Sequence, residues 1–578
     1  MESTAQAAPG AAPVSVPATL QASLLARLER MPDAKQVAQI GAVFGREFSY
    51  AMIRVVADLP DSVLNSGLDQ LVNSGLMFRR GETRDASYTF KHALVQDAAY
   101  DSLLRVRRVA LHAAIGAALE QDAEIVAMRP SLLGHHFAEA GAVEKATAYL
   151  LRAGEQASAG SALAEAETHL TRGLTLAADI AEASSRNLRL AELTLALSNV
   201  HMTVHGFGSP ENGAAAAEAV GLCRGLGPEH GAKTKLLARA LLGQWTFGIY
   251  RGRVMASYAV AEELLAFGRE HTDPQIRTIA ATLHGTSCCL LGRLQEGART
   301  FAAGVADLGL ESHAAPMVDF GVDGPCLLLI QSARLLACHG FLNTAGKQQR
   351  VGMERATRLQ HLPTISVTLG TSCTMAWILR DLGLLRSWSA EMARVAQEQG
   401  YGYWLARSKG YIGWLAAIDG RLDEGRALLT EELTELAAIG IVLFVPYTKA
   451  MLADVHARMG QCERALAVLN EALDTCNDTG EVWAEAELHR QKGELLRADP
   501  DTAETCFRRA IEIASAQSAK LFELRASVSL ARLWGEHGKR DEAHALLAPI
   551  HAWFTEGFDT PDLTDAKALL DEFAASPA

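Results

Sequence analysis

Hydrophobic positions recur at helical spacing through most of the chain, and the arrangement itself repeats. The segments that begin at Gly420, Gly460 and Gly538 share one pattern: a small residue lies five positions after the glycine and a bulky hydrophobic residue four positions later. The small residues of four units are spaced by 40, 38 and 40 positions: Gly425, Ala465, Ala503 and Ala543. The same register continues upstream at Gly141/Ala146, Gly252/Ser257, Gly292/Gly297, Gly340/Ala345 and Gly383/Trp388.

A second small residue recurs seven positions before the glycine, as Gly134, Gly285, Ala333, Ala376, Gly413, Ala453 and Ala531. Two small residues that face each other let two helix backbones approach closely, and a glycine between them can adopt the positive φ that ends the first helix. Such a hairpin cannot bury its own hydrophobic face, so neighbouring hairpins must stack. The pattern therefore predicts an all-α fold over 126–578, an α-solenoid of roughly ten helical hairpins.

Two places depart from the repeat. Trp388 occupies a position that is otherwise small, and the step from Gly292 to Gly340 is longer than the others. We therefore expect a distorted unit at 305–345, with the segment DFGVDGPC as a loop.

The N-terminal part follows a different pattern. Residues 1–16 are rich in Ala, Pro and Ser and are expected to be a disordered leader. From 17 to 125, short helical patterns, the first with Thr19 as a possible N-cap, precede the alternating segment LMFRRGETRDASYTF, which predicts a β-hairpin. This order predicts a small winged-helix domain followed by a connecting helix.

Several segments resemble a large family of bacterial signalling proteins. They are GREFSY (45–50), LDQLVNSGLMFRR (68–80), FKHALVQDAAYDSLL (90–104), LGHHFAEAG (133–141), GFGSPENG (206–213) and GEVWAEAELHRQKGELL (480–496). Members of that family combine a class III adenylate or guanylate cyclase domain, or another effector, with a STAND-type AAA+ ATPase, a winged helix and tetratricopeptide repeats. The resemblance implies that this chain corresponds to the winged helix and to repeats lengthened to about 40 residues.

The catalytic motifs of that family are not found in this sequence. A P-loop needs a lysine directly after its last glycine, whereas GLGPEHGAKT (225–234) places Ala232 between them. There is no paired-aspartate cyclase segment, no H-E-x-x-H and no G-x-S-x-G. His135 and His136 are adjacent on a predicted helix and therefore point about 100° apart. We expect no enzymatic activity, no cofactor and no metal site.

Composition and charge limit the class of protein. The 578 residues carry a net charge of -13, and 49% are hydrophobic, while the longest uncharged hydrophobic run, Leu436 to Val445, is too short for a membrane span. Nine cysteines form no C-x-x-C pair and are expected to be reduced. With no secretory signal at the N-terminus, these features predict a cytoplasmic protein that does not associate with membranes.

The segment after the predicted β-hairpin offers a candidate contact with an ATPase partner, formed by His92, Asp97, Arg105, Arg107 and Arg108. A structural role for the histidine is the alternative. Binding of nucleic acid is not expected, because the third helical segment, DSVLNSGLDQLVNSGL, contains two aspartates and no Lys or Arg.

Aromatic residues gather in one repeat: Tyr401, Tyr403, Trp404, Tyr411 and Trp414. If the first helix of each hairpin lines the concave surface of the solenoid, these residues could anchor a peptide there. The alternative interpretation is that they form hairpin core.

These features predict a non-catalytic regulatory module that binds a protein or peptide partner through its concave surface and couples that event to an NTPase or cyclase, on a separate chain if need be. Two alternatives stay open at this stage. The chain could belong to a longer adenylate cyclase or ATPase-like product with its catalytic domains upstream, or it could be a winged-helix transcription regulator.

Overall fold

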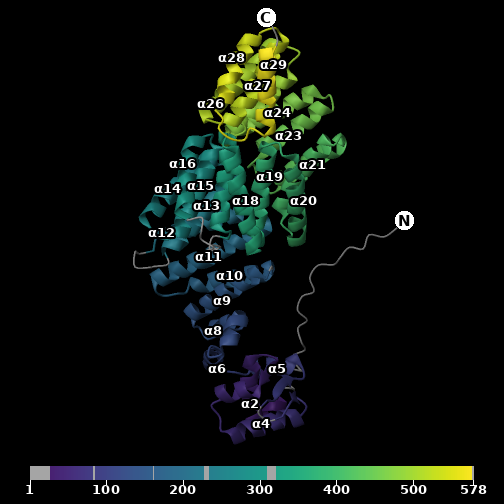
Figure 1. Cartoon of the computed structure of the whole chain (residues 1–578). Coiled ribbons are helices and arrows are strands. Elements are labelled where there is room, and N and C mark those ends of the chain that lie inside the picture. The colour runs from purple at the N-terminus through teal and green to yellow at the C-terminus, as the bar shows by residue number, and fades with distance from the viewer. Residues whose placement is uncertain (1–25, 83–84, 161, 227–232, 309–320, 576–578) are drawn as a thin grey trace, which may run out of the picture. The chain divides into compact units, whose positions relative to one another are not determined.

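A computed structural model describes residues 26–82, 85–160, 162–226, 233–308 and 321–575. The chain is mainly helical, with helices in packed hairpins and one small antiparallel sheet near the N-terminus (Figure 1). It divides into two compact units, Met1–Ala196 and Leu197–Ala578. The all-α prediction is confirmed. The expected leader at 1–16 and Thr19 lie outside the described residues, and the predicted domain boundary at 125 stays a prediction.

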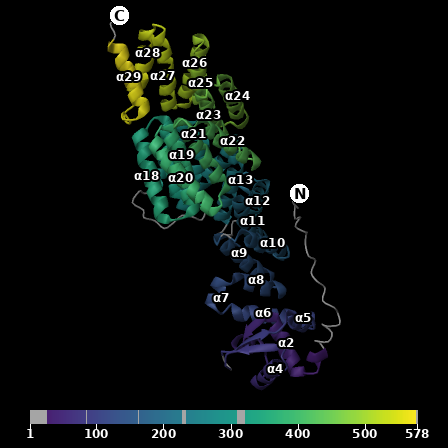
Figure 2. The same cartoon turned by 90° about the vertical axis from the view of Figure 1, so that its right-hand side faces the viewer.

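The first unit begins with a helical and β-stranded domain, whose small sheet is visible in Figure 2. Its elements are α2 (Pro32–Phe44), β1 (Glu47–Ser49), α3 (Tyr50–Val56), α4 (Asp61–Asn73), β2 (Met77–Arg80) and β3 (Ser87–Phe90). The strand order is β1-β3-β2, with Glu47 opposite Thr89 and Met77 opposite Phe90. The predicted β-hairpin is present; the third strand, β1, was missed because three residues are too short to show an alternating pattern.

The rest of the first unit is helical: α5 (Ala93–Asp101), α6 (Arg105–Leu119), α7 (Ala123–Met128), α8 (Pro130–Glu139), α9 (Val143–Ala159), α10 (Leu163–Ala177) and the start of α11 (Ala183–His205). Helices α8 and α9 form a hairpin that turns at Gly141, whose φ is +73°. This is the first repeat that the glycine register predicts.

The second unit continues with hairpins. Its helices are α12 (Pro210–Arg224), α13 (Lys233–Tyr250), α14 (Val254–Glu270), α15 (Pro274–Leu290), α16 (Leu294–Leu308), α17 (Gly324–His339), α18 (Leu342–Leu359), α19 (Leu362–Ile378), α20 (Leu382–Gln399), α21 (Gly402–Ile418), α22 (Leu422–Ala438), α23 (Val445–Arg458), α24 (Cys462–Thr479), α25 (Glu485–Leu495), α26 (Pro500–Gln517), α27 (Lys520–Glu536), α28 (Arg540–Ala552) and α29 (Pro561–Ala575). None of the described helices is long and hydrophobic enough to cross a membrane.

The small residues let the two helices of a hairpin pack closely, as their spacing predicts. A Cβ added to Gly425 of α22 would lie 2.6 Å from the carbonyl oxygen of Gly413 in α21, so the two backbones touch at this point. The turn between the helices is at Gly420, with φ at +89°. Close contact between backbones therefore sets the spacing within the hairpin.

The predicted register is wrong by three residues at one turn. Gly383 lies inside α20, and the residue with positive φ is Arg380, at +58°. Counting five positions from Arg380 gives Leu385, which is fully buried, whereas Trp388 is only partly buried. The 40-residue period is thus preserved, but with residue types that the glycine pattern does not reveal.

Later hairpins of the second unit contact earlier ones. The Val442 amide donates to the carbonyl of Tyr250 at 2.8 Å, and the Val482 amide donates to that of Leu290 at 2.8 Å. His339 Nδ1 lies 2.7 Å from the carbonyl oxygen of Ser518, 179 positions further along the chain. The solenoid therefore winds back on itself, and surfaces that the early hairpins present are covered by the late ones.

Candidate binding groove

A cavity of 460 Å³ lies among α19, α21, α23, α25, α27 and α29, the first helices of successive hairpins. In four hairpins, the residue that directly follows the small residue of the first helix lines this cavity. These groove-column residues are Trp414, Asp454, Glu494 and Arg532. Trp377 of α19 also lines the cavity, three positions after Thr374, the equivalent residue of its hairpin. Because the small residue faces the second helix, its successor, about 100° further around the helix, is directed toward the open side. The position of the small residue therefore determines both the packing of the hairpin and which side chain lines the groove.

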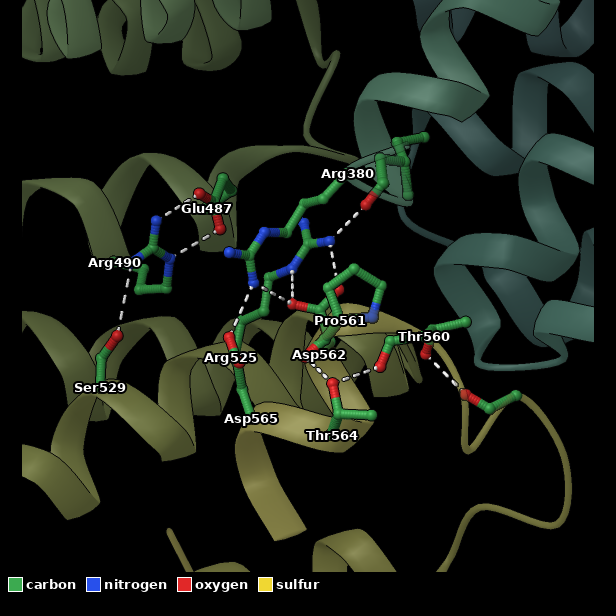
Figure 3. A network of polar contacts seen from close by, with 12 residues as sticks. Arg380, Glu487, Arg490, Arg525, Ser529, Thr560, Pro561, Asp562, Thr564 and Asp565 are labelled. Carbon is green, nitrogen blue, oxygen red and sulfur yellow. Dashed lines mark hydrogen bonds and ion pairs between the residues drawn. The ribbon is translucent and has the colours of Figure 1, made fainter. Parts of the chain in front are cut away.

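A buried ion pair closes one side of the groove (Figure 3). The Arg525 guanidinium donates from Nε and Nη2 to the two carboxylate oxygens of Asp562, at 2.8 and 2.6 Å. Arg525 also donates to the carbonyl oxygen of Ile378, at the end of α19. Arg380 reaches Asp562 at 3.3 Å and Asp565 at 3.1 Å. These contacts tie the α19–α20 turn to α27 and α29.

The charge state of Asp562 follows from this pairing. Burial by itself would raise the pKa of its carboxyl, but the Arg525 and Arg380 guanidinium groups outweigh that effect and hold the pKa below its usual value. The carboxylate is therefore ionised at neutral pH. A buried charge of this kind is stable only while its partner is present.

A second network holds the floor of the groove. Arg490 donates to both carboxylate oxygens of Glu487, at 2.6 and 2.9 Å, and its Nη1 lies 3.4 Å from the Ser529 hydroxyl. Ser529 in turn donates to Glu494 at 2.6 Å. Burial would raise the pKa of Glu487, yet Arg490 lowers it. The contacts run between α25 and α27 and fix the side chains that face the cavity.

The remaining lining combines hydrophobic surface with unused donors. Trp377 is buried, while Trp414 is half-buried and donates through Nε1 to Asp454 at 2.9 Å. Arg458 donates to the same carboxylate oxygen at 3.0 Å. Arg532 is exposed and makes no hydrogen bond or ion pair with any residue that the structure describes. The groove therefore offers indole surface next to a guanidinium group without a partner.

Trp414 is the aromatic residue of the predicted set that lines this groove. Tyr403 and Trp404 instead meet Phe207 at ring-centroid distances of 5.4 and 6.4 Å, close to Tyr250. Tyr403 is buried, and Trp404 packs on the backbone of α19.

The other two residues of the set lie apart from the groove. Tyr401 is half-buried, just before α21 begins. Tyr411 is buried, and its hydroxyl contacts Thr374 at 2.8 Å and the Tyr447 hydroxyl.

Tyr411 belongs to a buried polar cluster that the sequence did not predict. Arg407 contacts Glu432, Tyr411 and Tyr447, and it donates to the Thr448 hydroxyl at 2.9 Å. Burial raises the pKa of Glu432 to about 7, against the opposing effect of Arg407. These residues come from neighbouring hairpins, and no spacing in the sequence marks them as partners.

The predicted contact of the first unit lies on an exposed surface. His92 and Asp97 are exposed, and neither side chain makes a hydrogen bond or ion pair within the described part of the chain. Arg105 and Arg107 flank Val106, which is 84% exposed at the start of α6.

The third arginine of this set is placed differently. The Arg108 guanidinium lies over the ring of Tyr100, 5.1 Å from its centroid. Of the three arginines, it is the one anchored to the domain.

Histidines meet at the contact between α6 and α8. Nδ1 of His112 lies 2.9 Å from Nδ1 of His136, so one ring donates and the other accepts. Burial, and then the neighbouring histidines, lower the pKa to about 4 for His112 and about 3 for His136. Both rings are therefore neutral at pH 7.

Sequence comparison finds a relative of low identity. No protein-family model matches the chain. An uncharacterised protein of Rhizobium meliloti (strain 1021), R02095, is 27% identical over 526 residues, a match that covers 88% of this chain. The chain spans about half of the length of that relative, since the match covers 50% of it.

Among solved structures, a Rap protein complexed with competence and sporulation factor is 9% identical, with a TM-score of 0.44, over 66% of this chain and 99% of its own. A STAND protein with a tetratricopeptide-repeat sensor from Pyrococcus horikoshii is 11% identical, with a TM-score of 0.27, over 97% of this chain and 67% of its own. At these identities and TM-scores neither structure assigns a role to this chain. The structure itself shows a series of packed helical hairpins.

Proposed function

We propose that this chain is a non-catalytic scaffold that binds a segment of a partner protein in the groove enclosed by α19 to α29. The observation that carries the proposal is the groove column, in which four hairpins each place an equivalent side chain on a shared 460 Å³ cavity. That volume is within the range of about 300–1,000 Å³ that ligand pockets occupy. It suits a few residues of an extended peptide.

The lining indicates which peptide would bind. Trp377 and Trp414 offer a hydrophobic wall for an aliphatic or aromatic side chain. Arg532 has donors with no partner among the described residues, whereas the groove carboxylates accept hydrogen bonds already. A hydrophobic residue next to an acidic residue is therefore the preferred sequence.

Selection from a displayed library of random peptides on the purified chain tests this proposal. We expect enrichment of peptides with adjacent hydrophobic and acidic residues, and loss of that enrichment in Trp414→Ala. Trp553→Ala is the matched control, because that tryptophan is 37% exposed outside the groove and its loss should leave the selection unchanged. Equal enrichment by Trp414→Ala and the wild-type chain would contradict the proposal.

We further infer that the scaffold belongs to a bacterial signalling ATPase or cyclase system. Three features support this inference: the chain spans half of its relative, the first domain has the helix–strand–helix–helix–strand–strand order of a winged helix, and α6 exposes Val106 between Arg105 and Arg107. Exposed hydrophobic residues flanked by cations suit docking of an NTPase or cyclase, on another chain or in a longer product.

Calorimetry with ATP and Mg²⁺ tests whether this chain binds nucleotide itself or leaves that role to a separate NTPase. We expect no heat of binding from this chain alone, because its sequence holds no P-loop. Micromolar affinity for ATP would mean that the chain carries its own nucleotide site, and the scaffold interpretation would fail.

A further inference from the structure

Three side chains with metal-ligating atoms converge between α15 and α16, away from the groove. His284 and Cys288 are one helical turn apart on α15, and Glu296 comes from α16. One ligand atom from each of the three lies within 4.8 Å of the others. Residues four positions apart share one face of a helix, so the histidine and the cysteine are directed toward the same point.

The nitrogen–oxygen distance is longer than a direct hydrogen bond requires. His284 Nε2 lies 3.5 Å from a carboxylate oxygen of Glu296 and 4.0 Å from the sulfur of Cys288, and that sulfur lies 3.6 Å from Nδ1 of the same ring. A nitrogen–oxygen hydrogen bond is usually about 2.7–3.2 Å long. Ligands of a tetrahedral ion with bonds of about 2.0 Å to N and O and about 2.3 Å to S would be separated by about 3.3 Å for N···O and about 3.6 Å for N···S. The observed N···O and N···S distances are closer to those between ligands of a tetrahedral ion than to a direct hydrogen bond.

The surrounding contacts would orient the ligands. The Thr300 hydroxyl lies 3.1 Å from Nδ1 of His284, so it can accept a hydrogen bond from the N–H at that position and leave the Nε2 lone pair for a cation. Tyr258 donates to Glu296 at 2.9 Å and holds the carboxylate in place. Residues that hydrogen-bond to the ligating side chains in this way are a regular feature of metal sites in proteins.

The carboxylate side of the cluster is its exposed side. His284 and Cys288 are buried, whereas the side chain of Glu296 is 36% exposed. An ion could therefore approach from the carboxylate side, and water could complete its coordination there.

We propose that His284, Cys288 and Glu296 bind a divalent ion of the zinc class. A mixed nitrogen, sulfur and oxygen ligand set favours Zn²⁺ over the harder Mg²⁺ and Ca²⁺. Binding releases the thiol proton of Cys288 to solvent and joins the two helices of one hairpin. The proposal replaces the expectation of no metal site, and it is independent of peptide binding in the groove.

Titration of the chelator-treated full chain with Co²⁺, which replaces Zn²⁺ and absorbs visible light, tests the proposal. We expect one tight equivalent with thiolate-to-cobalt absorption that Zn²⁺ abolishes. Cys288→Ser should lose the thiolate band, and His284→Ala should weaken Co²⁺ binding at least tenfold. Cys289→Ser is the matched control, because it alters the adjacent buried cysteine and should keep the band.

The helical circular dichroism of each variant shows that loss of the band is not loss of the fold. The absence of tight Co²⁺ binding to the wild-type chain would overturn the proposal. So would a thiolate band that survives in Cys288→Ser, since the exposed Cys462 would then be the ligand.

Discussion

Removal of the charge of Arg525 should release α29 from the groove. In Arg525→Met the side chain keeps a similar length but loses both hydrogen bonds to Asp562 and the one to the carbonyl of Ile378. Removal of one partner of a buried ion pair costs about 3–5 kcal/mol, because the other charge stays buried. Asp562 retains Arg380 at 3.3 Å, so the lower end of that range, about 3 kcal/mol, applies.

Amide hydrogen exchange measures this effect locally, because the repeats of a solenoid can open separately. A cost of about 3 kcal/mol corresponds to roughly 100-fold faster exchange in α29, with α13 to α16 unchanged. Arg380→Ala is the control: that side chain is 49% exposed, so its loss should cost less than about 1 kcal/mol. Unchanged protection of the α29 amides from exchange in Arg525→Met would refute the claim that this ion pair holds α29 against the groove.

Three further predictions concern the histidines of the first unit and two glycines inside helices of the second. The pKa values of His112 and His136 are lowered to about 4 and about 3, so the unfolded chain binds more protons than the folded one below pH 6.5. Stability should therefore fall as pH drops from 6.5 to 4, by on the order of 1–2 kcal/mol per histidine at pH 5, and the double Asn variant should flatten this slope in thermal melts. Gly425→Ala should destabilise its hairpin by roughly 1–3 kcal/mol in urea unfolding, since the added Cβ meets the backbone of Gly413 at 2.6 Å. Gly346→Ala, where an added Cβ meets nothing within 4 Å, should instead stabilise α18 by about 0.5–1 kcal/mol.

The glycine register predicted most of the hairpins because it reports a local requirement. A turn that ends a helix with positive φ, and two backbones in contact across it, restrict residue type at fixed positions. At Arg380 a non-glycine residue adopts φ of +58°, so the register there could not be read from glycines. The strand Glu47–Ser49 could not be predicted either, because it is short and is defined by pairing with Ser87–Phe90, which is distant in sequence.

The groove was only partly predictable. Trp414, Asp454 and Arg532 follow small residues that the repeat identifies, so their register was available although their chemistry was not. Glu494 follows Gly493, which the repeat pattern did not include. Trp414 was found by its aromatic ring; Arg532 occupies the equivalent position on α27 and carries no signal of its own. Asp562, which Arg525 holds in place, lies outside the repeat register altogether.

The winding of the solenoid decides whether a column position faces a cavity or a core. Two earlier hairpins place Thr286 and Arg334 directly after their small residues, as the groove column does, yet these residues are 6% and 1% exposed. The Arg334 guanidinium lies 5.2 Å from the ring centroid of Phe444, a residue that precedes α23, more than a hundred positions later. Later hairpins thus bury the column of the early ones, while the column from Trp414 to Arg532 keeps its cavity. No property of a single repeat distinguishes the two cases, because the difference arises from contacts between hairpins far apart in the chain.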